Sequence, residues 1–343
     1  MANSNEKKVL LHLEGVKMHF PLKKSSIFQK EKLYVKAVDG IDLDIYEGET
    51  FGLVGESGCG KSTLGRVILQ LYKQTAGKIT YSNGDGEPID LSTLSTEQMR
   101  HLRKELQVIF QDPYSSLNPK LTVSQIISEA LVAHKMFKAG SQELEDYVLE
   151  TMNKCGLQPY MMHRYPHQFS GGQRQRIGIA RALALMPRFV VCDEAVSALD
   201  VSIQSQIINL LIDLKEMNSL TYLFISHDLS AVKFISDRIG VMYLGNMVEL
   251  CPSEAIFREP LHPYTHALLD SIPTTEEASN KELKTIEGDI PSPIRPPSGC
   301  KFHTRCRYAT PECAETAPEW REFRPGHYVA CHYPITEGRE VDY

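Results

Sequence analysis

One segment near the N-terminus contains the residue types that bind phosphate groups: GESGCGKS over 55–62, followed by Thr63. Its glycines let the backbone wrap closely, so that consecutive N–H groups can point at phosphate oxygens. Lys61 can reach β- and γ-phosphates, and the hydroxyl of Ser62 can ligate Mg²⁺. A Gly-rich turn that binds nothing is the alternative, but an apolar run before the segment and helical spacing after it favour nucleotide binding. The predicted ligands are Gly55, Glu56, Ser57, Gly58, Cys59, Gly60, Lys61, Ser62 and Thr63.

A second apolar run, FVVCDE over 189–194, ends in two carboxylates. Asp193 would hold Mg²⁺ through water, and Glu194 could polarise an attacking water as a general base. Two surface acids at the end of a strand are the alternative interpretation. The carboxyl ends of parallel strands lie at the edge of the sheet where a phosphate loop also lies, and this favours the catalytic interpretation.

Residues 170–173, SGGQ, precede a basic helix with an apolar face over 174–183. Ser170 is a favourable N-cap, and the two glycines expose backbone N–H groups. Taken alone, the segment is equally well explained as a capped helix with no further role.

Together these segments resemble the ATP-binding-cassette (ABC) ATPases, whose signature motif is LSGGQ; Phe169 occupies its first position here. Three further family motifs occur in the family's order. Gln111, after an apolar run, resembles the Q-loop glutamine, SALD (197–200) resembles the D-loop, and His227 resembles the switch histidine. A lone histidine or glutamine is usually structural, whereas six motifs in family order make coincidence a poor explanation.

The resemblance implies that two such subunits hold two ATP molecules between them, head to tail. Nucleotide binding would close the dimer and hydrolysis would weaken it, and the rate would come from positioning and charge stabilisation. The catalytic residues that it implies are Lys61, Gln111, Glu194 and His227, with Ser62, Gln111 and Asp193 as Mg²⁺ ligands. The residues that would contact the γ-phosphate held by the partner are Ser170, Gly171, Gly172 and Gln173.

Two positions add to this comparison. Most family members place proline after the catalytic glutamate, but this chain has Ala195. Because proline fixes φ, its loss is expected to loosen the placement of Glu194 and slow hydrolysis without abolishing it. Tyr34, upstream of the first core strand, is expected to stack on adenine; a packed surface tyrosine is an equally good explanation.

Four of the eight cysteines fall near the C-terminus with the spacing Cys300-x5-Cys306-x6-Cys313-x17-Cys331. In a reducing cytoplasm, clustered cysteines more often bind metal than form disulfides. The spacing contains no C-x-x-C, which is usual for structural zinc. Four thiolates suit zinc or an iron–sulfur cluster, and a metal-free interpretation also stays open. In a zinc site a histidine could replace a thiolate, and the candidates are His303, His327 and His332.

The chain also resembles the ATPase subunits of oligopeptide and dipeptide permeases, over nearly its whole length. The segments that carry this likeness are QDPYSSLNP (111–119), DVSIQSQ (200–206), LHPYTHAL (261–268), PSPI (291–294) and PPSGCKFHTRC (296–306). The likeness is greatest to the F-type subunit, which pairs with a related D-type subunit. Some members of the group carry a [4Fe–4S] cluster on these cysteines, so we expect that cluster rather than zinc. Its expected role is to hold together a small extension with little core of its own.

The permease resemblance implies a complete set of partners. They are a paralogous D-type ATPase subunit as the other half of a heterodimer, two transmembrane permease subunits, and, indirectly, an extracytoplasmic peptide-binding protein. The expected function is ATP hydrolysis that powers oligopeptide import at the cytoplasmic face of the membrane. A dipeptide or nickel importer ATPase of the same group stays open. Residues 111–119, with Tyr114 and Leu117, would carry the nucleotide state to the membrane subunits; ordinary loop packing is the alternative for both side chains.

The elements that must position these residues alternate between strand and helix. Apolar runs without polar alternation predict strands over 50–54, 106–110, 189–192, 221–225 and 239–243, in a parallel sheet covered on both faces. Helical spacing over 61–70 follows the first of them. Helical patterns over about 122–138, 141–156 and 171–186 interrupt the alternation and predict an inserted helical subdomain within about 112–185.

These elements predict an α/β fold: an ABC-type P-loop NTPase domain over 1–250 and a small Cys-rich C-terminal extension over 251–343. The segment 287–299, with four prolines and two glycines, predicts an extended connector before the cysteines. A length of 343 residues suits about two domains.

Composition limits the function classes. Lys and Arg number 37 against 43 Asp and Glu, for a net charge of −6, which excludes a generally basic nucleic-acid binder. No apolar run reaches the roughly 18 residues of a membrane span, and the first ten residues lack the apolar core of a signal peptide. We therefore expect a cytoplasmic protein that docks peripherally on membrane partners.

Two other function classes are weaker. Soluble ABC proteins of translation usually hold two cassettes, and those of DNA repair interrupt the cassette with a long coiled coil, whereas this chain has one uninterrupted cassette; a role in iron–sulfur assembly belongs to the same soluble class. A redox or regulatory protein that merely binds ATP is disfavoured by the presence of Glu194 and His227.

Overall fold

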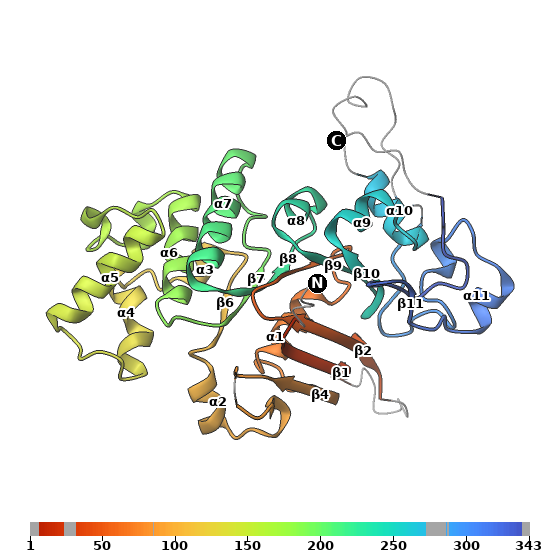
Figure 1. Ribbon diagram of the computed structural model, residues 1–343, viewed down its shortest axis with the longest axis horizontal. Coiled ribbons are helices and arrows are strands. Elements are labelled where there is room, and N and C mark those ends of the chain that lie inside the picture. The colour runs from red at the N-terminus through yellow and green to blue at the C-terminus, as the bar shows by residue number, and fades with distance from the viewer. Residues whose placement is uncertain (1–6, 24–31, 85, 272–285, 287, 338–343) are drawn as a thin grey trace, which may run out of the picture. The chain divides into compact units, whose positions relative to one another are not determined.

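The computed structural model describes residues 7–23, 32–84, 86–271, 286 and 288–337 (Figure 1). The first six residues, considered above for a signal peptide, and residue 287, where the expected connector begins, lie outside this set. The chain divides into two compact units. The first comprises Met1–Val9, Tyr46–Thr50 and Thr93–Ser226, and the second comprises Leu10–Ile45, Phe51–Ser92 and His227–Tyr343.

The first unit contains three parallel strands: β6 (Leu106–Ile109), β7 (Phe189–Asp193) and β8 (Thr221–Ile225), with β7 in the middle. Every residue of β7 and β8 is buried. Strands covered on both faces need no polar alternation, which is why their sequences are continuous apolar runs. The predicted parallel strands are confirmed here, within one residue of their expected ends.

Helices make up the rest of the first unit, and Figure 1 shows α4, α5 and α6 gathered into one cluster. Ser or Thr caps the N-terminus of each of these three helices. Each ends a few residues before the end expected from sequence, because left-handed backbone at Lys135, Gly156 and Met186 follows. The helices are α2 (Thr96–Leu102), α3 (Pro113–Ser116), α4 (Val123–Ala133), α5 (Gln142–Lys154), α6 (Gly171–Leu183) and α7 (Val201–Asn218), with 3-10 turns at Pro159–Met161 and Pro166–Gln168.

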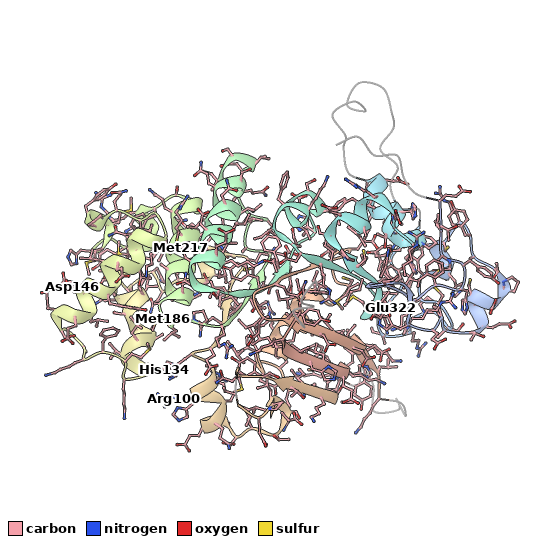
Figure 2. The ribbon with its side chains drawn as sticks, in the orientation of Figure 1. Arg100, His134, Asp146, Met186, Met217 and Glu322 are labelled. Carbon is pink, nitrogen blue, oxygen red and sulfur yellow. The ribbon has the colours of Figure 1, made fainter. Side chains whose placement is uncertain are left out.

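Side-chain hydrogen bonds join these helices to one another. Figure 2 draws the side chains and labels Arg100 on α2. The hydroxyl of Tyr147 on α5 donates to the carbonyl of Ala184, just after α6, at 2.8 Å. Arg100 on α2 donates to the carbonyl of Ala133 at the end of α4, at 3.3 Å. The helical subdomain is therefore connected to α2 and to the end of α6, the helices that precede β6 and β7 in sequence.

The second unit contains most of β3 (Thr50–Val54) and a mixed sheet in the order β11-β12-β10-β9-β3. Only β3 and β9 pair in parallel; the other neighbours are antiparallel. A second sheet has the order β2-β1-β4-β5, with β4 antiparallel to both β1 and β5, and was not expected from the sequence. The further strands are β1 (Val9–Pro21), β2 (Tyr34–Tyr46), β4 (Ala76–Tyr81), β5 (Ile89–Asp90), β9 (Arg238–Tyr243), β10 (Asn246–Pro252), β11 (Arg321–Arg324) and β12 (His327–Val329).

The C-terminal residues join this sheet rather than forming a separate layer. Strand β12 pairs with β10 through Glu249 opposite Val329, so the polypeptide returns to the cassette after the cysteine-rich loop. Irregular backbone over 288–299 agrees with the expected connector. The helices of the second unit are α1 (Lys61–Ile68), α8 (Leu229–Ile235), α9 (Ser253–Arg258), α10 (Pro263–Asp270) and α11 (Pro311–Glu315), with 3-10 turns at Leu91–Thr93 and His303–Arg305 (η5).

Candidate functional site

The phosphate loop lies between β3 and α1 in the second unit. Gly55 and Gly60 adopt positive φ angles of 147° and 112°. A Cβ at Gly55 would lie 2.2 Å from the carbonyl oxygen of Met242, and one at Gly60 would lie 2.0 Å from that of Ala37. Neighbouring backbone therefore excludes any side chain at either position, and the loop can present its N–H groups directly to a ligand.

Lys61 is buried, with 4% of its surface exposed, and its Nζ is held inside the loop. It donates to the carbonyl of Gly55 at 2.6 Å and to that of Glu56 at 3.1 Å. Burial raises the pKa of the Cys59 thiol, whose sulfur lies 3.7 Å from the same Nζ. The loop thus holds Lys61 Nζ at its centre, which suits a polyanionic ligand.

The first unit holds the two carboxylates at the end of β7. Asp193 is buried, and Glu194 has a left-handed φ of 51°. The Nε2 of Gln111, two residues beyond β6, donates to Oε2 of Glu194 at 2.7 Å. The structure therefore brings together two residues that lie 83 positions apart in the sequence. The amide fixes the direction of the carboxylate, as a general base requires.

The SGGQ segment begins α6 in the same unit. Ser170 Oγ accepts from the Gln173 N–H at 3.3 Å, and the Gln173 side chain accepts from the Ser170 N–H at 3.0 Å. A Cβ at Gly172 would lie 2.5 Å from Cγ2 of Ile203 on α7. Ser170 and Gly171 are exposed, whereas Phe169, in the motif's first position, is buried and belongs to the core.

The two side chains of the 111–119 segment that are expected to carry the nucleotide state to the membrane partners differ in exposure. Tyr114 is 65% exposed, and its ring lies 3.8 Å from the guanidinium of Arg174. Leu117 is only 2% exposed. Leu117 therefore packs in the interior, as the loop-packing alternative expects, while Tyr114 is available at the surface.

Two further predicted residues belong to the second unit, with the phosphate loop. His227 is exposed two residues after β8, and the next residue, Asp228, caps α8 by accepting from the Ser230 N–H at 2.8 Å. Tyr34 is the first residue of β2 and is 38% exposed. Ala37 on the same strand is the residue whose carbonyl faces Gly60, so Tyr34 lies on a strand that borders the loop.

The four C-terminal cysteines line one pocket, together with His303 and His332. All four are free thiols. The N–H of Cys300 donates to the carbonyl of Cys313 at 2.8 Å, which brings the two ends of the loop together. Burial raises the pKa of Cys331 to about 12, and it raises the pKa of Cys300 and Cys306 as well. A bound cation would reverse this preference for the neutral thiol.

Another buried polar group was not predicted from the sequence. Glu249 on β10 accepts from the N–H groups of Leu261 and His262 at 2.6 and 2.9 Å and pairs with His327 Nε2 at 2.8 Å. With Cys251 it forms the one set of three potential metal ligands within 4.8 Å of one another among the described residues. Because both carboxylate oxygens already have N–H partners, we interpret the set as structural. A single Glu in an apolar strand gives no sequence signal for this role.

Two family models match the chain. Residues 38–197 match the family described as ABC transporter, and residues 248–313 match the family described as Oligopeptide/dipeptide transporter, C-terminal region. The putative oligopeptide transport ATP-binding protein YkfD of Bacillus subtilis is 53% identical over 96% of this chain and 98% of its own length. The oligopeptide transport ATP-binding protein OppF of Salmonella typhimurium is 49% identical over 95% of this chain and 96% of its own. The chain belongs to the ATP-binding subunits of the oligopeptide/dipeptide ABC transporter family.

Solved structures agree with this assignment. The ATP-binding cassette MJ0796, described as a dimer bound to ADP and Pi, superimposes with a TM-score of 0.61 over 71% of this chain and 99% of its own, at 28% identity. CbiO1 from Clostridium perfringens gives a TM-score of 0.61 over 73% of this chain and 91% of its own, at 26% identity. The expected ABC-type fold and ATPase class are confirmed. Within the described residues, no helix combines the length and the apolar character needed to cross a bilayer.

Proposed function

We propose that this subunit hydrolyses ATP to power the import of oligopeptides through an ABC transporter. The observation that carries the proposal is the near-complete alignment with curated oligopeptide transport ATP-binding proteins, at 53% and 52% identity for two of them. The separate match over 248–313 supports it, because that region belongs to oligopeptide and dipeptide transporters. A dipeptide or nickel importer of the same group is the alternative.

The partners follow from this assignment. The chain would pair with a paralogous D-type ATPase subunit and dock on two transmembrane permease subunits at the cytoplasmic face of the membrane. An extracytoplasmic peptide-binding protein would deliver the cargo. The cassette would span residues 1–250 and the extension 251–343. The exposed Tyr114, beside Arg174, is the side chain we assign to contact with the permease.

The chemistry would depend on charge and position. Lys61 Nζ donates to two backbone carbonyls of the loop, and it can exchange them for β- and γ-phosphate oxygens. Glu194, oriented by Gln111, would accept the proton of the attacking water. His227 would contact the γ-phosphate. Mg²⁺, when bound, would neutralise developing charge on the phosphates; the oxygen ligands proposed from the sequence are Ser62, Gln111 and Asp193.

The exposed start of α6 would serve the partner's nucleotide. Ser170 and the N–H groups of Gly171 and Gly172 lie at a helix N-terminus, which favours an anion. ATP bound between two subunits would hold them together, and hydrolysis would let them separate. Tyr34 would stack on the adenine. Ala195, in place of proline, would make hydrolysis slower without removing the base.

We further propose that the four C-terminal cysteines hold a [4Fe–4S] cluster. Tetrahedral zinc, with Zn–S bonds of about 2.3 Å, brings its sulfurs to within roughly 4 Å of one another. No three of these sulfurs lie mutually within 4.8 Å, although all four line one pocket. A [4Fe–4S] cluster attaches each thiolate to a different iron, so its four sulfurs can lie further apart than those around one zinc ion. This spacing supports the cluster over zinc.

Metal analysis tests the cluster. Protein purified anaerobically should be brown and contain about four irons per chain, and Cys313→Ser should lose both properties. A colourless protein that binds one zinc per chain would contradict the proposal. Cys155→Ser, at a buried cysteine of the first unit, is the matched control and should leave the iron content unchanged.

Uptake by the reconstituted transporter tests the function. The complete complex is purified, its bound cargo is identified by mass spectrometry, and uptake into proteoliposomes is measured with ATP inside or outside. His227→Ala in this subunit should reduce ATP-driven peptide uptake at least about tenfold. Co-purification with ribosomes or DNA and no membrane subunits, or nickel as the only cargo, would contradict the proposal.

A further inference from the structure

A salt bridge connects the cysteine-rich extension to the phosphate loop. Arg305, in the η5 turn between Cys300 and Cys306, donates from Nη1 and Nη2 to the two carboxylate oxygens of Glu56, at 2.7 and 3.0 Å. The Arg305 side chain is 4% exposed and that of Glu56 is 19% exposed. Two parallel N–H···O bonds that are shielded from water fix both the position and the direction of the carboxylate.

The backbone of Glu56 is held as well as its side chain. Its N–H donates to the hydroxyl of Tyr264 on α10 at 2.8 Å, and its carbonyl accepts from Lys61 Nζ at 3.1 Å. The contacts therefore run from Arg305 through Glu56 to Lys61, within one compact unit. A residue in the phosphate loop is thus restrained by two side chains that come from the extension.

The Arg305 turn is itself held by the loop that carries the cysteines. The Arg305 N–H donates to the carbonyl of Phe302 at 2.9 Å, and the His303 N–H donates to that of Cys300 at 3.0 Å. The backbone of the turn that carries Arg305 is therefore held by short-range bonds between the two cysteines. The extension places a cation where the phosphate loop has an anion.

The negative charge of Glu56 makes its salt bridge with Arg305 important for nucleotide binding. Its carbonyl already touches the lysine that would contact β- and γ-phosphates, so its carboxylate lies on a residue of the phosphate site. Without Arg305, a partly buried negative charge would remain there, and it would repel the phosphates and release the loop. We infer that Arg305 is a positioning residue for nucleotide binding, which makes the C-terminal extension part of the ATP site.

The test is a double-mutant cycle on the full-length protein, with Arg305→Met, Glu56→Gln and the double variant. The dissociation constant for ATP is measured by calorimetry, with iron content and the thermal unfolding midpoint as further readouts. Arg305→Met should weaken ATP binding about tenfold, equivalent to about 1.4 kcal/mol. Glu56→Gln alone should weaken ATP binding less than Arg305→Met does, because it leaves no negative charge beside the phosphates. The double variant should recover most of the affinity, because it has no uncompensated carboxylate.

Two results would overturn the inference: wild-type affinity in Arg305→Met, or a double variant as weak as Arg305→Met. The second result would mean that Arg305 supports the fold without acting through Glu56. Arg307→Ala is the matched control, because this neighbouring arginine is exposed and stacks on Tyr308; its ATP affinity should equal wild type. If Arg305→Met does not fold, Arg305→Lys takes its place in the cycle with Glu56→Gln. It should bind ATP about threefold more weakly than wild type, since lysine cannot form both bonds, and the same two results would overturn the inference.

Discussion

His262 should make the stability of the extension fall as the pH is lowered. The side chain is 1% exposed, and its Nδ1 accepts from the N–H of Tyr264 at 3.0 Å, which caps the start of α10. Only an unprotonated Nδ1 can accept this bond. Burial lowers the pKa of His262 from 6.5 to about 4; neighbouring His266 acts in the same direction, and Glu249 opposes them.

The size and sign of the effect follow from these two pKa values. Above pH 6.5 the imidazole is neutral in both the folded and the unfolded protein, so it adds no pH dependence. Below pH 6.5 the unfolded chain binds a proton that the folded protein rejects until about pH 4. Each pH unit in this window costs about 1.4 kcal/mol of folding free energy, so about 2 kcal/mol should be lost between pH 7 and pH 5.

Urea unfolding measures this loss, with the fluorescence of Trp320 as the readout. Trp320 is the one tryptophan of the chain, and it stacks on Tyr328 in the extension. His262→Asn is the comparison variant, because asparagine keeps an acceptor at the helix cap and does not titrate. Wild type should lose about 2 kcal/mol more than the variant between pH 7 and pH 5. Equal losses in the two proteins would refute the reasoning.

Three further predictions concern the nucleotide site. Gly172→Ala should lower the free energy of unfolding in urea by about 1–3 kcal/mol, since its Cβ would meet Ile203 at 2.5 Å. Adding Ile203→Ala should relieve the clash. Unchanged stability in the single variant would be evidence against the clash. Gln111→Ala should lower the ATPase rate about tenfold or more, because Glu194 loses the amide that orients it; an unaltered rate would count against this role. Tyr34→Ala should weaken ATP binding about three- to tenfold in a titration with Tyr34→Phe as control, and equal affinities would disprove stacking.

The sequence predicts correctly those elements whose signal lies within a short stretch of residues. Strands β3, β7 and β8 are continuous apolar runs because both faces are covered, and their limits were predicted within one residue. The phosphate loop was found because close backbone approach at Gly55 and Gly60 leaves no alternative to glycine. The start of α6 was predicted because its Ser170 cap is a short-range signal.

What the sequence could not give are contacts between distant residues. Arg305 and Glu56 are 249 positions apart, and Glu249 and His327 are 78 apart; neither pair leaves a periodic or local pattern. The exposure of Leu117 could not be predicted for a related reason. A leucine in a polar loop has the same type whether it packs inward or faces a partner, and only the fold decides between the two.

The ATPase rate of a Glu194→Gln variant in the purified transporter tests the account most directly. The amide keeps the shape of the side chain next to Gln111 and cannot accept a proton from water. Hydrolysis should fall at least about a hundredfold while ATP stays bound. Hydrolysis at the wild-type rate, with normal peptide uptake, would contradict the assignment of this residue as the base that drives the cycle.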